Sequence, residues 1–180
     1  MNAAATVLVT GARGFIGAHV VAALRRSDFD VRAGVRAPAS DTQFACDLNT
    51  PAQVRAAVAG ARLVVHTAYG DSAAMAQQCR HLLNAMRQEG VDSLIHLSSI
   101  AVYGEAAGLI DETIPPCGRL DAYAAAKIEC EDLIGEWAAE PAYPARRALI
   151  LRPGIVYGAG SRFWIDKLAE RIRCGAWGTF

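Results

Sequence analysis

The sequence predicts an α/β fold with a doubly wound parallel sheet, and two observations point to it. Short apolar, β-branched runs alternate with longer segments whose apolar residues recur at helical spacing, and three glycines join the first run to the first helical segment. Strands that alternate with helices pair in parallel through right-handed crossovers. The 180 residues are enough for one such domain, or for one domain and part of a second.

Six short runs rich in Val, Ile and Leu are the expected strands. They cover residues 6–10, 30–36, 42–48, 61–68, 92–99 and 146–154. Five segments with helical spacing are the expected helices, over residues 15–26, 51–59, 71–90, 121–140 and 163–177. The second helix has Thr50 as its N-cap, Pro51 at its first position and Gly60 past its end. Residues 105–120 form the one long irregular stretch, and loops of that length are usually functional.

Composition excludes several classes of protein. Eighteen basic residues balance eighteen acidic ones, which argues against a protein that binds nucleic acid through bulk charge. The first residues lack the charged and apolar regions of a signal peptide, and no apolar run reaches the length of a membrane span. Five scattered cysteines without a CxxC pair indicate neither a disulfide framework nor a zinc site. We therefore expect a cytoplasmic protein without a metal, a membrane partner or a nucleic-acid partner.

The glycines Gly11, Gly14 and Gly17 lie between the first strand and the first helix. In such a turn, glycines allow a tight bend, a close approach of the backbone to a ligand and tight packing of helix on strand. The free N–H groups at the start of the helix, around Phe15 and Ile16, would then face a pyrophosphate. The alternative is a strand–helix turn in which the glycines have no ligand.

The end of the second strand bears on the choice of cofactor. A site for NAD usually has a carboxylate there, whereas this chain has Arg36, and Arg13 lies in the glycine loop. Guanidinium groups match a 2′-phosphate, so the sequence favours NADP, with NAD as the alternative. Asp47, followed by Leu48, ends the third strand, where a carboxylate could accept a hydrogen bond from adenine. Each arginine can instead be a solvated surface residue, and Asp47 a cap for the next turn.

Tyr123 and Lys127 are four residues apart and share one face of a helix. The pKa of a free tyrosine is about 10, and a nearby ammonium group lowers it toward the range of a useful acid or base. Ser98 and Ser99 follow the fifth strand at its carboxyl end, where α/β sheets bind ligands. Together these residues predict a proton-transfer site beside the glycine loop.

The stretches TGARGFIG, CDL, VVHTA, HLSSIAVYG, YAAAK and LRPGIVYGAG occur in this order over nearly the whole chain. With them the chain resembles the extended short-chain dehydrogenase/reductases, the NAD-dependent epimerase/dehydratase group. The resemblance implies a Rossmann fold and a catalytic set of Ser99, Tyr123 and Lys127, and it selects Ser99 over Ser98. Tyr123 would exchange the proton, Lys127 would lower its pKa and hold the nicotinamide ribose, and Ser99 would orient the substrate oxygen.

The resemblance also implies further cofactor contacts. These are Thr67, Ala68 and Tyr69 in a loop that passes the cofactor, and Pro153 and Gly154 at the nicotinamide end. Tyr103 would lie near the substrate, and its alternative is a packed aromatic residue. Members of the family continue into a smaller domain, so we expect a cofactor-binding domain over residues 1–160 and the start of a truncated substrate-binding region over 161–180.

The implied function is hydride transfer between a nicotinamide and a carbinol or carbonyl carbon, in an epimerase, dehydratase or oxidoreductase acting on a small molecule such as a nucleotide sugar. A reductase for small ketones or aldehydes and a non-catalytic NADP-binding module are the alternatives, and the 180 residues alone are expected to lack turnover. Relatives commonly form homodimers through the helices expected at 71–90 and 121–140. Apolar residues available for such a contact, some of which must belong to the core of the chain itself, are Met75, Leu82, Met86, Ile128 and Leu133.

Overall fold

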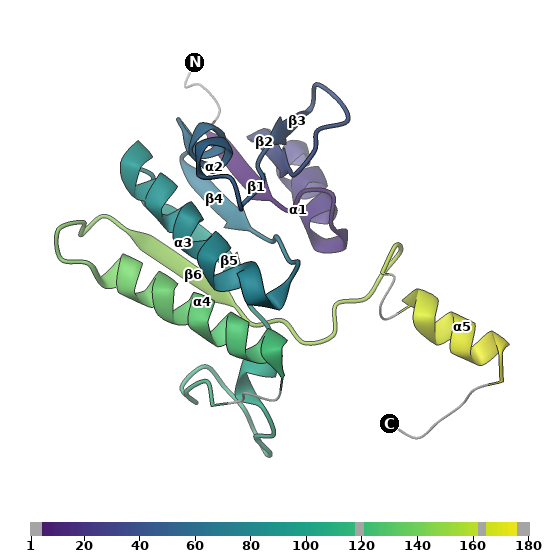
Figure 1. Cartoon of the computed structure of the whole chain (residues 1–180). Helices are drawn as coiled ribbons and strands as arrows, with labels where there is room; N and C mark the ends of the chain where they lie inside the picture. Colours follow the sequence, from purple (N-terminus) through teal and green to yellow (C-terminus); the bar gives the residue numbers. More distant parts are fainter. Residues whose placement is uncertain (1–4, 118–120, 162–164, 176–180) are drawn as a thin grey trace.

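A parallel six-stranded sheet forms the centre of the chain, in the order β3-β2-β1-β4-β5-β6 (Figure 1). The structure is a computed structural model that describes residues 5–117, 121–161 and 165–175. Its strands are β1 (Thr6–Thr10), β2 (Asp30–Val35), β3 (Gln43–Ala45), β4 (Leu63–His66), β5 (Ser93–Leu97) and β6 (Arg147–Leu151). The chain passes from β1 outward to β3 and then returns to place β4 beside β1, which makes this junction the point where strand order reverses. The expected doubly wound parallel sheet is confirmed.

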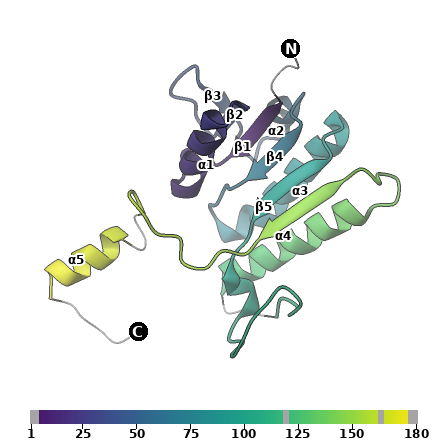
Figure 2. The same ribbon diagram turned by 180° about the vertical axis from the view of Figure 1, so that it is seen from behind.

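Helices cover the sheet unequally on its two faces. They are α1 (Phe15–Arg26), α2 (Pro51–Val58), α3 (Ser72–Glu89), η1 (Ile100–Tyr103), α4 (Ala122–Ala139) and α5 (Lys167–Arg173). The larger apolar core lies between the sheet and α2, α3 and α4, and a smaller one lies between the sheet and α1. On the α1 face no described helix covers β6, whose Leu149 and Leu151 are 51% and 44% exposed (Figure 2).

Several strands end earlier than the sequence predicts, and the residues after them enter loops at the carboxyl edge of the sheet. β4 ends at His66, β5 at Leu97 and β6 at Leu151. The short helix η1, which the sequence did not predict, follows β5. Thr50 holds the N-cap position of α2 as expected, but its side chain makes no capping hydrogen bond within the described residues.

The C-terminal part departs most from expectation. The helix expected over 163–177 is α5 in the structure, and residues 163, 164, 176 and 177 lie outside the described part. Both views place α5 away from the sheet and its helices (Figures 1 and 2). The boundary near residue 160 and the substrate-binding region after it therefore stay predictions. Across the described ranges, no helix combines the length and the apolar character that a membrane crossing needs.

The apolar residues expected at a dimer contact belong to the core of the chain itself. Met75, Leu82 and Met86 are buried in the larger core, against which Leu133 packs, and Ile128 is buried in a small cluster with Val102 and Tyr103. The outward faces of α3 and α4 are polar instead, and the exposed pair Arg80–Glu129 joins them at 2.7 Å. A homodimer through these helices would thus use a polar surface, and it remains a prediction.

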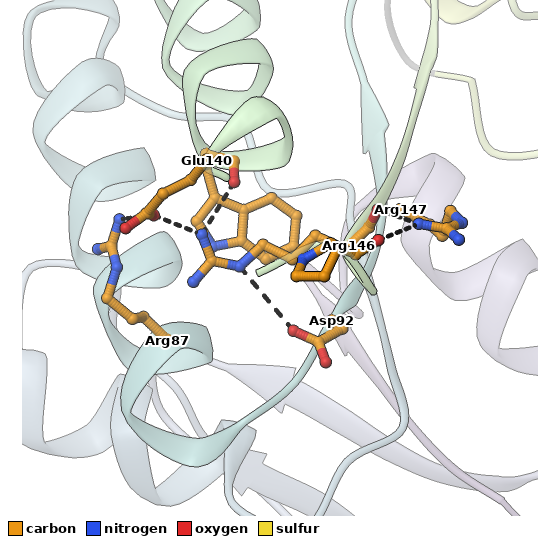
Figure 3. A network of polar contacts seen from close by, with 7 residues as sticks. Arg87, Asp92, Glu140, Arg146 and Arg147 are labelled. Atoms are coloured by element: carbon orange, nitrogen blue, oxygen red, sulfur yellow. Dashed lines mark hydrogen bonds and ion pairs between the residues drawn. The ribbon is translucent and has the colours of Figure 1, made fainter. Parts of the chain in front are cut away.

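An ion-pair network lies at the amino edge of the sheet, opposite the carboxyl edge where the loops after β4, β5 and β6 lie (Figure 3). Arg146, just before β6, is buried between the rings of Trp137 and Tyr143, whose centroids lie 4.7 and 3.7 Å from its guanidinium carbon. Its Nη1 donates to Glu140 Oε2 at 2.6 Å, and Arg87 Nη2 donates to the same oxygen at 2.9 Å. The network ties the ends of α3 and α4 to the start of β6.

Candidate functional site

The glycine loop lies against the loop that follows β4. Gly11 has φ +70°, and a Cβ there would be 2.6 Å from the Cα of Ala68. A Cβ at Gly17, inside α1, would be 2.7 Å from Thr67 Oγ1. Real Cβ atoms do not approach so closely, so both positions require glycine if the helix is to pack this tightly on the sheet. The structure thereby brings the glycine loop together with Thr67 and Ala68.

The start of α1 is open to a ligand. Gly14 is the N-cap residue with an extended backbone, and α1 begins at Phe15 and continues through Ile16. No side chain in the described part of the chain caps this start. The first N–H groups of a helix carry the positive end of its dipole, so an uncapped start suits an anion such as a pyrophosphate.

Hydrogen bonds fix the carboxyl ends of β1 and β4 beside this loop. Thr67 Oγ1 donates to the carbonyl of Thr10 at 2.7 Å, and the Oγ1 of Thr10 lies 2.7 Å from His66 Nδ1. These bonds hold the two strands at the point where the strand order reverses, the place where α/β sheets bind ligands.

Arg13, in the glycine loop, reaches the end of β2, which Arg36 follows. Both are exposed, and Arg13 Nη1 donates to the carbonyl of Ala37 at 3.3 Å. The guanidinium of Arg13 therefore reaches the residue that follows Arg36. The residues from Arg36 to Ser40 include no carboxylate, so a role of the two arginines toward a 2′-phosphate stays a prediction.

Asp47 has the capping role that was its alternative interpretation. Its Oδ1 accepts hydrogen bonds from the backbone N–H of Asn49 at 3.0 Å and from Asn49 Nδ2 at 3.1 Å. The next residue, Leu48, is buried, and its carbonyl lies 2.8 Å from His81 Nδ1. A role of Asp47 and Leu48 toward adenine stays a prediction.

Tyr123, in the first turn of α4, contacts two predicted site residues. The Ser99 hydroxyl forms a hydrogen bond that lowers the pKa of the phenol, and the ring of Tyr69 meets the Tyr123 ring edge-on at 5.3 Å between centroids. Burial has the larger effect, so the pKa of Tyr123 is raised above its usual value. Ser99 also caps η1, because its Oγ accepts from the N–H of Ala101 at 3.2 Å.

Lys127, one turn further along α4, is buried with its charge directed at the backbone. Its Nζ donates to the carbonyl of Leu97 at 2.6 Å and lies 5.8 Å from the centroid of the Tyr123 ring. Burial lowers the pKa of Lys127, and the neighbouring Cys130 and Cys79 thiols oppose that shift. We expected Lys127 to lower the pKa of Tyr123. In the chain by itself burial of the phenol outweighs the opposing effects, so a lowering of this pKa by Lys127 stays a prediction for the cofactor-bound state.

The two serines after β5 have different partners. Ser98 is buried and donates its hydroxyl to Glu131, whereas Ser99 faces Tyr123. The geometry thus agrees with the choice of Ser99 as the residue beside the reacting oxygen. Tyr103 is buried, and its hydroxyl donates to the carbonyl of Asp111 at 3.2 Å, which fits its alternative interpretation as a packed aromatic residue.

The turn after β6 lies beside η1. The carbonyl of Pro153 accepts from the N–H of Ile100 at 3.1 Å, and a Cβ on the exposed Gly154 would be 3.7 Å from Ile100 Cδ1. Pro153 and Gly154 therefore reach the same edge of the sheet as Ser99, as expected from the sequence.

Two residues of this edge were missed from the sequence, Glu131 and Arg152. Glu131 lies one turn after Lys127 on the same face of α4, and it forms a two-pronged ion pair with Arg152, the residue before Pro153. The spacing Tyr123–Lys127–Glu131 was the available signal, since residues four apart share a helix face.

Comparison with known proteins identifies the family. The model of the NAD dependent epimerase/dehydratase family matches residues 7–176. The chain belongs to this family.

Three relatives show how far the likeness extends. A UDP-glucose 4-epimerase of Thermus thermophilus, solved with NAD, is 28% identical with a TM-score of 0.78 over 94% of this chain and 63% of its own. MoeE5, solved with UDP-glucose and NAD, is 31% identical with a TM-score of 0.77 over 92% of this chain and 60% of its own. A 3-beta-hydroxysteroid dehydrogenase of Mycolicibacterium neoaurum is 26% identical over 94% of this chain and 52% of its own. The chain spans 29% to 55% of the length of the curated relatives that it matches.

Proposed function

We propose that this chain is the cofactor-binding part of a nicotinamide-dependent enzyme that moves a hydride to or from a carbinol or carbonyl carbon. The observation that carries the proposal is the meeting of Ser99, Tyr123 and Lys127 at the edge of the sheet that also holds the glycine loop. The similarity to relatives solved with NAD supports the same class of cofactor.

The residues present fit a dinucleotide. The uncapped start of α1 leaves backbone N–H groups for a pyrophosphate, and the glycines Gly11 and Gly17 let the loop and the helix pack closely against the ends of β1 and β4. The nicotinamide end would lie beside Lys127, Pro153 and Gly154. These residues are on the β5–β6 side of the junction between β1 and β4, where the strand order reverses. When bound, the nicotinamide supplies or accepts the hydride.

Tyr123 is the residue proposed to move the proton. Its raised pKa keeps the phenol protonated at neutral pH, and this form can donate a proton to a carbonyl oxygen that receives a hydride. Ser99, which already hydrogen-bonds the phenol, would orient that oxygen. The protonated phenol is the form that reduction needs, whereas oxidation of a carbinol needs the phenolate, which a fall in the pKa of Tyr123 on binding of the cationic nicotinamide would supply.

For the substrate, a nucleotide sugar is the leading candidate, since the two NAD-bound relatives are a UDP-glucose epimerase and a protein solved with UDP-glucose. An alcohol or ketone on a compact apolar molecule is the second candidate, because two curated relatives are 3-beta-hydroxysteroid dehydrogenases matched over 94% of this chain. Both reactions use the same proton and hydride steps.

NADP is the proposed form of the cofactor. Arg13 and Arg36 together can neutralise a 2′-phosphate, and Arg13 is already held over the end of β2 by its bond to Ala37. The two relatives solved with NAD leave the choice between NAD and NADP open for this chain.

The test separates binding from chemistry. Binding is measured on the 180 residues as the rise in melting temperature with NADPH or NADH, and turnover is measured on the protein that the whole gene encodes, with UDP-sugars and hydroxysteroids.

Tyr123→Phe should keep the thermal shift and lose about 10²-fold or more in turnover. Tyr143→Phe is the matched control, because it removes a hydroxyl at the opposite edge and keeps the ring against Arg146. An unchanged melt at saturating cofactor would refute the binding role, and normal turnover of Tyr123→Phe would refute the assigned chemistry.

A further inference from the structure

A buried carboxylate lies directly behind the proposed catalytic pair. Glu131 is 6% exposed and follows Tyr123 and Lys127 on one face of α4. A buried charge is costly unless it is paired and hydrogen-bonded. Glu131 accepts the Ser98 hydroxyl at Oε1 and the fork of Arg152, with Nη2 2.7 Å and Nε 3.2 Å from Oε2 and Nε 3.1 Å from Oε1.

Arg152 extends this contact to a third segment. Its Nη1 donates to the hydroxyl of Tyr103 at 2.6 Å, and its guanidinium carbon lies 5.0 Å from the centre of that ring. Tyr103 ends η1, and its hydroxyl donates onward to the carbonyl of Asp111 in the irregular stretch. A planar guanidinium can make all these contacts at once, whereas an ammonium cannot.

The three segments joined in this way carry the parts of the proposed site. Glu131 is on the helix of Tyr123 and Lys127, Tyr103 is on the turn of helix that Ser99 begins, and Arg152 immediately precedes Pro153. Ser99 and Tyr123, on the first two segments, lie near enough for the serine hydroxyl to lower the pKa of the phenol. Any change in how the segments sit relative to one another would change this contact.

We propose that Glu131, Arg152 and Tyr103 form a clamp of positioning residues that sets the place of Ser99 and of the turn at Pro153 relative to Tyr123 and Lys127. This inference rests on the proposed function. Its consequence is specific, because the clamp lies at the nicotinamide end of the proposed site and not at the glycine loop. Breaking the clamp should therefore weaken the binding of the nicotinamide half of the cofactor and leave the binding of its adenine half unchanged.

The measurement compares two ligands on the 180-residue chain by calorimetric titration, NADPH and 2′-phospho-ADP-ribose, which lacks the nicotinamide. Glu131→Gln leaves the cation of Arg152 without its charged partner. It should lower the ratio of the affinity for NADPH to the affinity for 2′-phospho-ADP-ribose by about tenfold. Tyr103→Phe keeps the ion pair and removes only the hydroxyl link, so it should fold even if the first variant does not. It should shift the same ratio by about threefold.

Glu140→Gln is the matched control. It breaks another Arg–Glu pair between α4 and the start of β6, with Arg146 Nη1 2.6 Å from Glu140 Oε2, but at the opposite edge of the sheet (Figure 3). It should lower the melting temperature without changing the ratio of the two affinities.

The outcomes separate the inference from the function on which it rests. If the unaltered chain binds neither these ligands nor NADH and ADP-ribose, the proposed function fails; if it binds only NADH and ADP-ribose, the same comparison is made with that pair. If it binds both and the ratio is the same in Glu131→Gln or in Tyr103→Phe as in the unaltered chain, the clamp is overturned. A ratio that falls in both variants and stays constant in Glu140→Gln would support it.

Discussion

Mild acid should destabilise the chain through two histidines that lie under α3 and α4. His66 on β4 and His96 on β5 are 5% and 1% exposed, and their rings stack with centroids 5.1 Å apart. Burial lowers the pKa of His66 to about 3 and that of His96 to about 2, and the nearby charge of Lys127 adds to both shifts. Both imidazoles are therefore neutral in the folded chain at any pH near neutrality.

The magnitude follows from proton linkage. The unfolded chain has the usual histidine pKa of about 6.5, so it binds more protons than the folded chain below that pH, and acid favours unfolding. The stabilisation is present in full above about pH 6.5 and is lost as the pH falls toward the folded values. Between pH 7 and pH 5 the loss is about 2 kcal/mol for each histidine and about 4 kcal/mol for the pair. Any folded pKa below about 4 gives the same result, because only the unfolded chain titrates in this window.

The variant His96→Leu isolates one half of the effect. Neither ring nitrogen of His96 has a hydrogen-bond partner in the part of the chain that the structure describes, so the substitution should cost little stability at pH 7. It should reduce the loss between pH 7 and pH 5 from about 4 to about 2 kcal/mol. His19→Gln, at an exposed position on α1, is the control and should keep the full loss.

Urea unfolding at pH 7, 6 and 5 measures these differences, and most carboxylates stay ionised over that range. An unfolding free energy that does not change between pH 7 and pH 5 would contradict the buried, neutral state of the two rings. A pH dependence in His96→Leu equal to that of the unaltered chain would assign the effect to other groups.

Three further predictions concern the cofactor, the glycine loop and assembly. Arg36→Ala should remove the preference for NADPH over NADH in calorimetric titration, and a preference for NADH that the substitution leaves unchanged would show that Arg36 plays no part. Gly17→Ala should destabilise the chain by about 1–3 kcal/mol in urea unfolding, because the new Cβ would overlap the backbone carbonyl oxygen of Gly11 and lie 2.7 Å from Thr67 Oγ1. Gly135→Ala, on the exposed face of α4 with nothing within 4 Å of the added Cβ, should instead stabilise it by about 0.5–1 kcal/mol, and equal effects of the two would count against the packing argument. Light scattering at micromolar concentration should show the expected homodimer, and a monomer alone would contradict it.

The sequence predicted those features of the chain that depend on a local pattern of residues. The glycine loop, the alternation of strands with helices and the pair Tyr123–Lys127 all depend on neighbours within one or two turns of the chain. Periodicity, caps and spacing carry such information directly, because helices and strands repeat every 3.6 and 2 residues. The family itself followed from the order of these local motifs, and its model matches residues 7–176.

Contacts between distant segments were decided only by the tertiary structure. The resemblance had selected Ser99 over Ser98, but only the structure showed that Ser98 binds the buried Glu131 while Ser99 faces Tyr123. The pairing of Glu131 with Arg152, 21 residues away, depends on β6 lying beside β5 and under α4.

Burial likewise changed the expected chemistry and the expected surface. The sequence by itself predicted which residues could transfer a proton, and it determined in which elements they lie. It could not determine that the pKa of Tyr123 is raised, or that Met75 and Leu82 are inside the core. The physical reason is that desolvation depends on everything packed around a group, and those neighbours come from segments that only the folded sheet brings together.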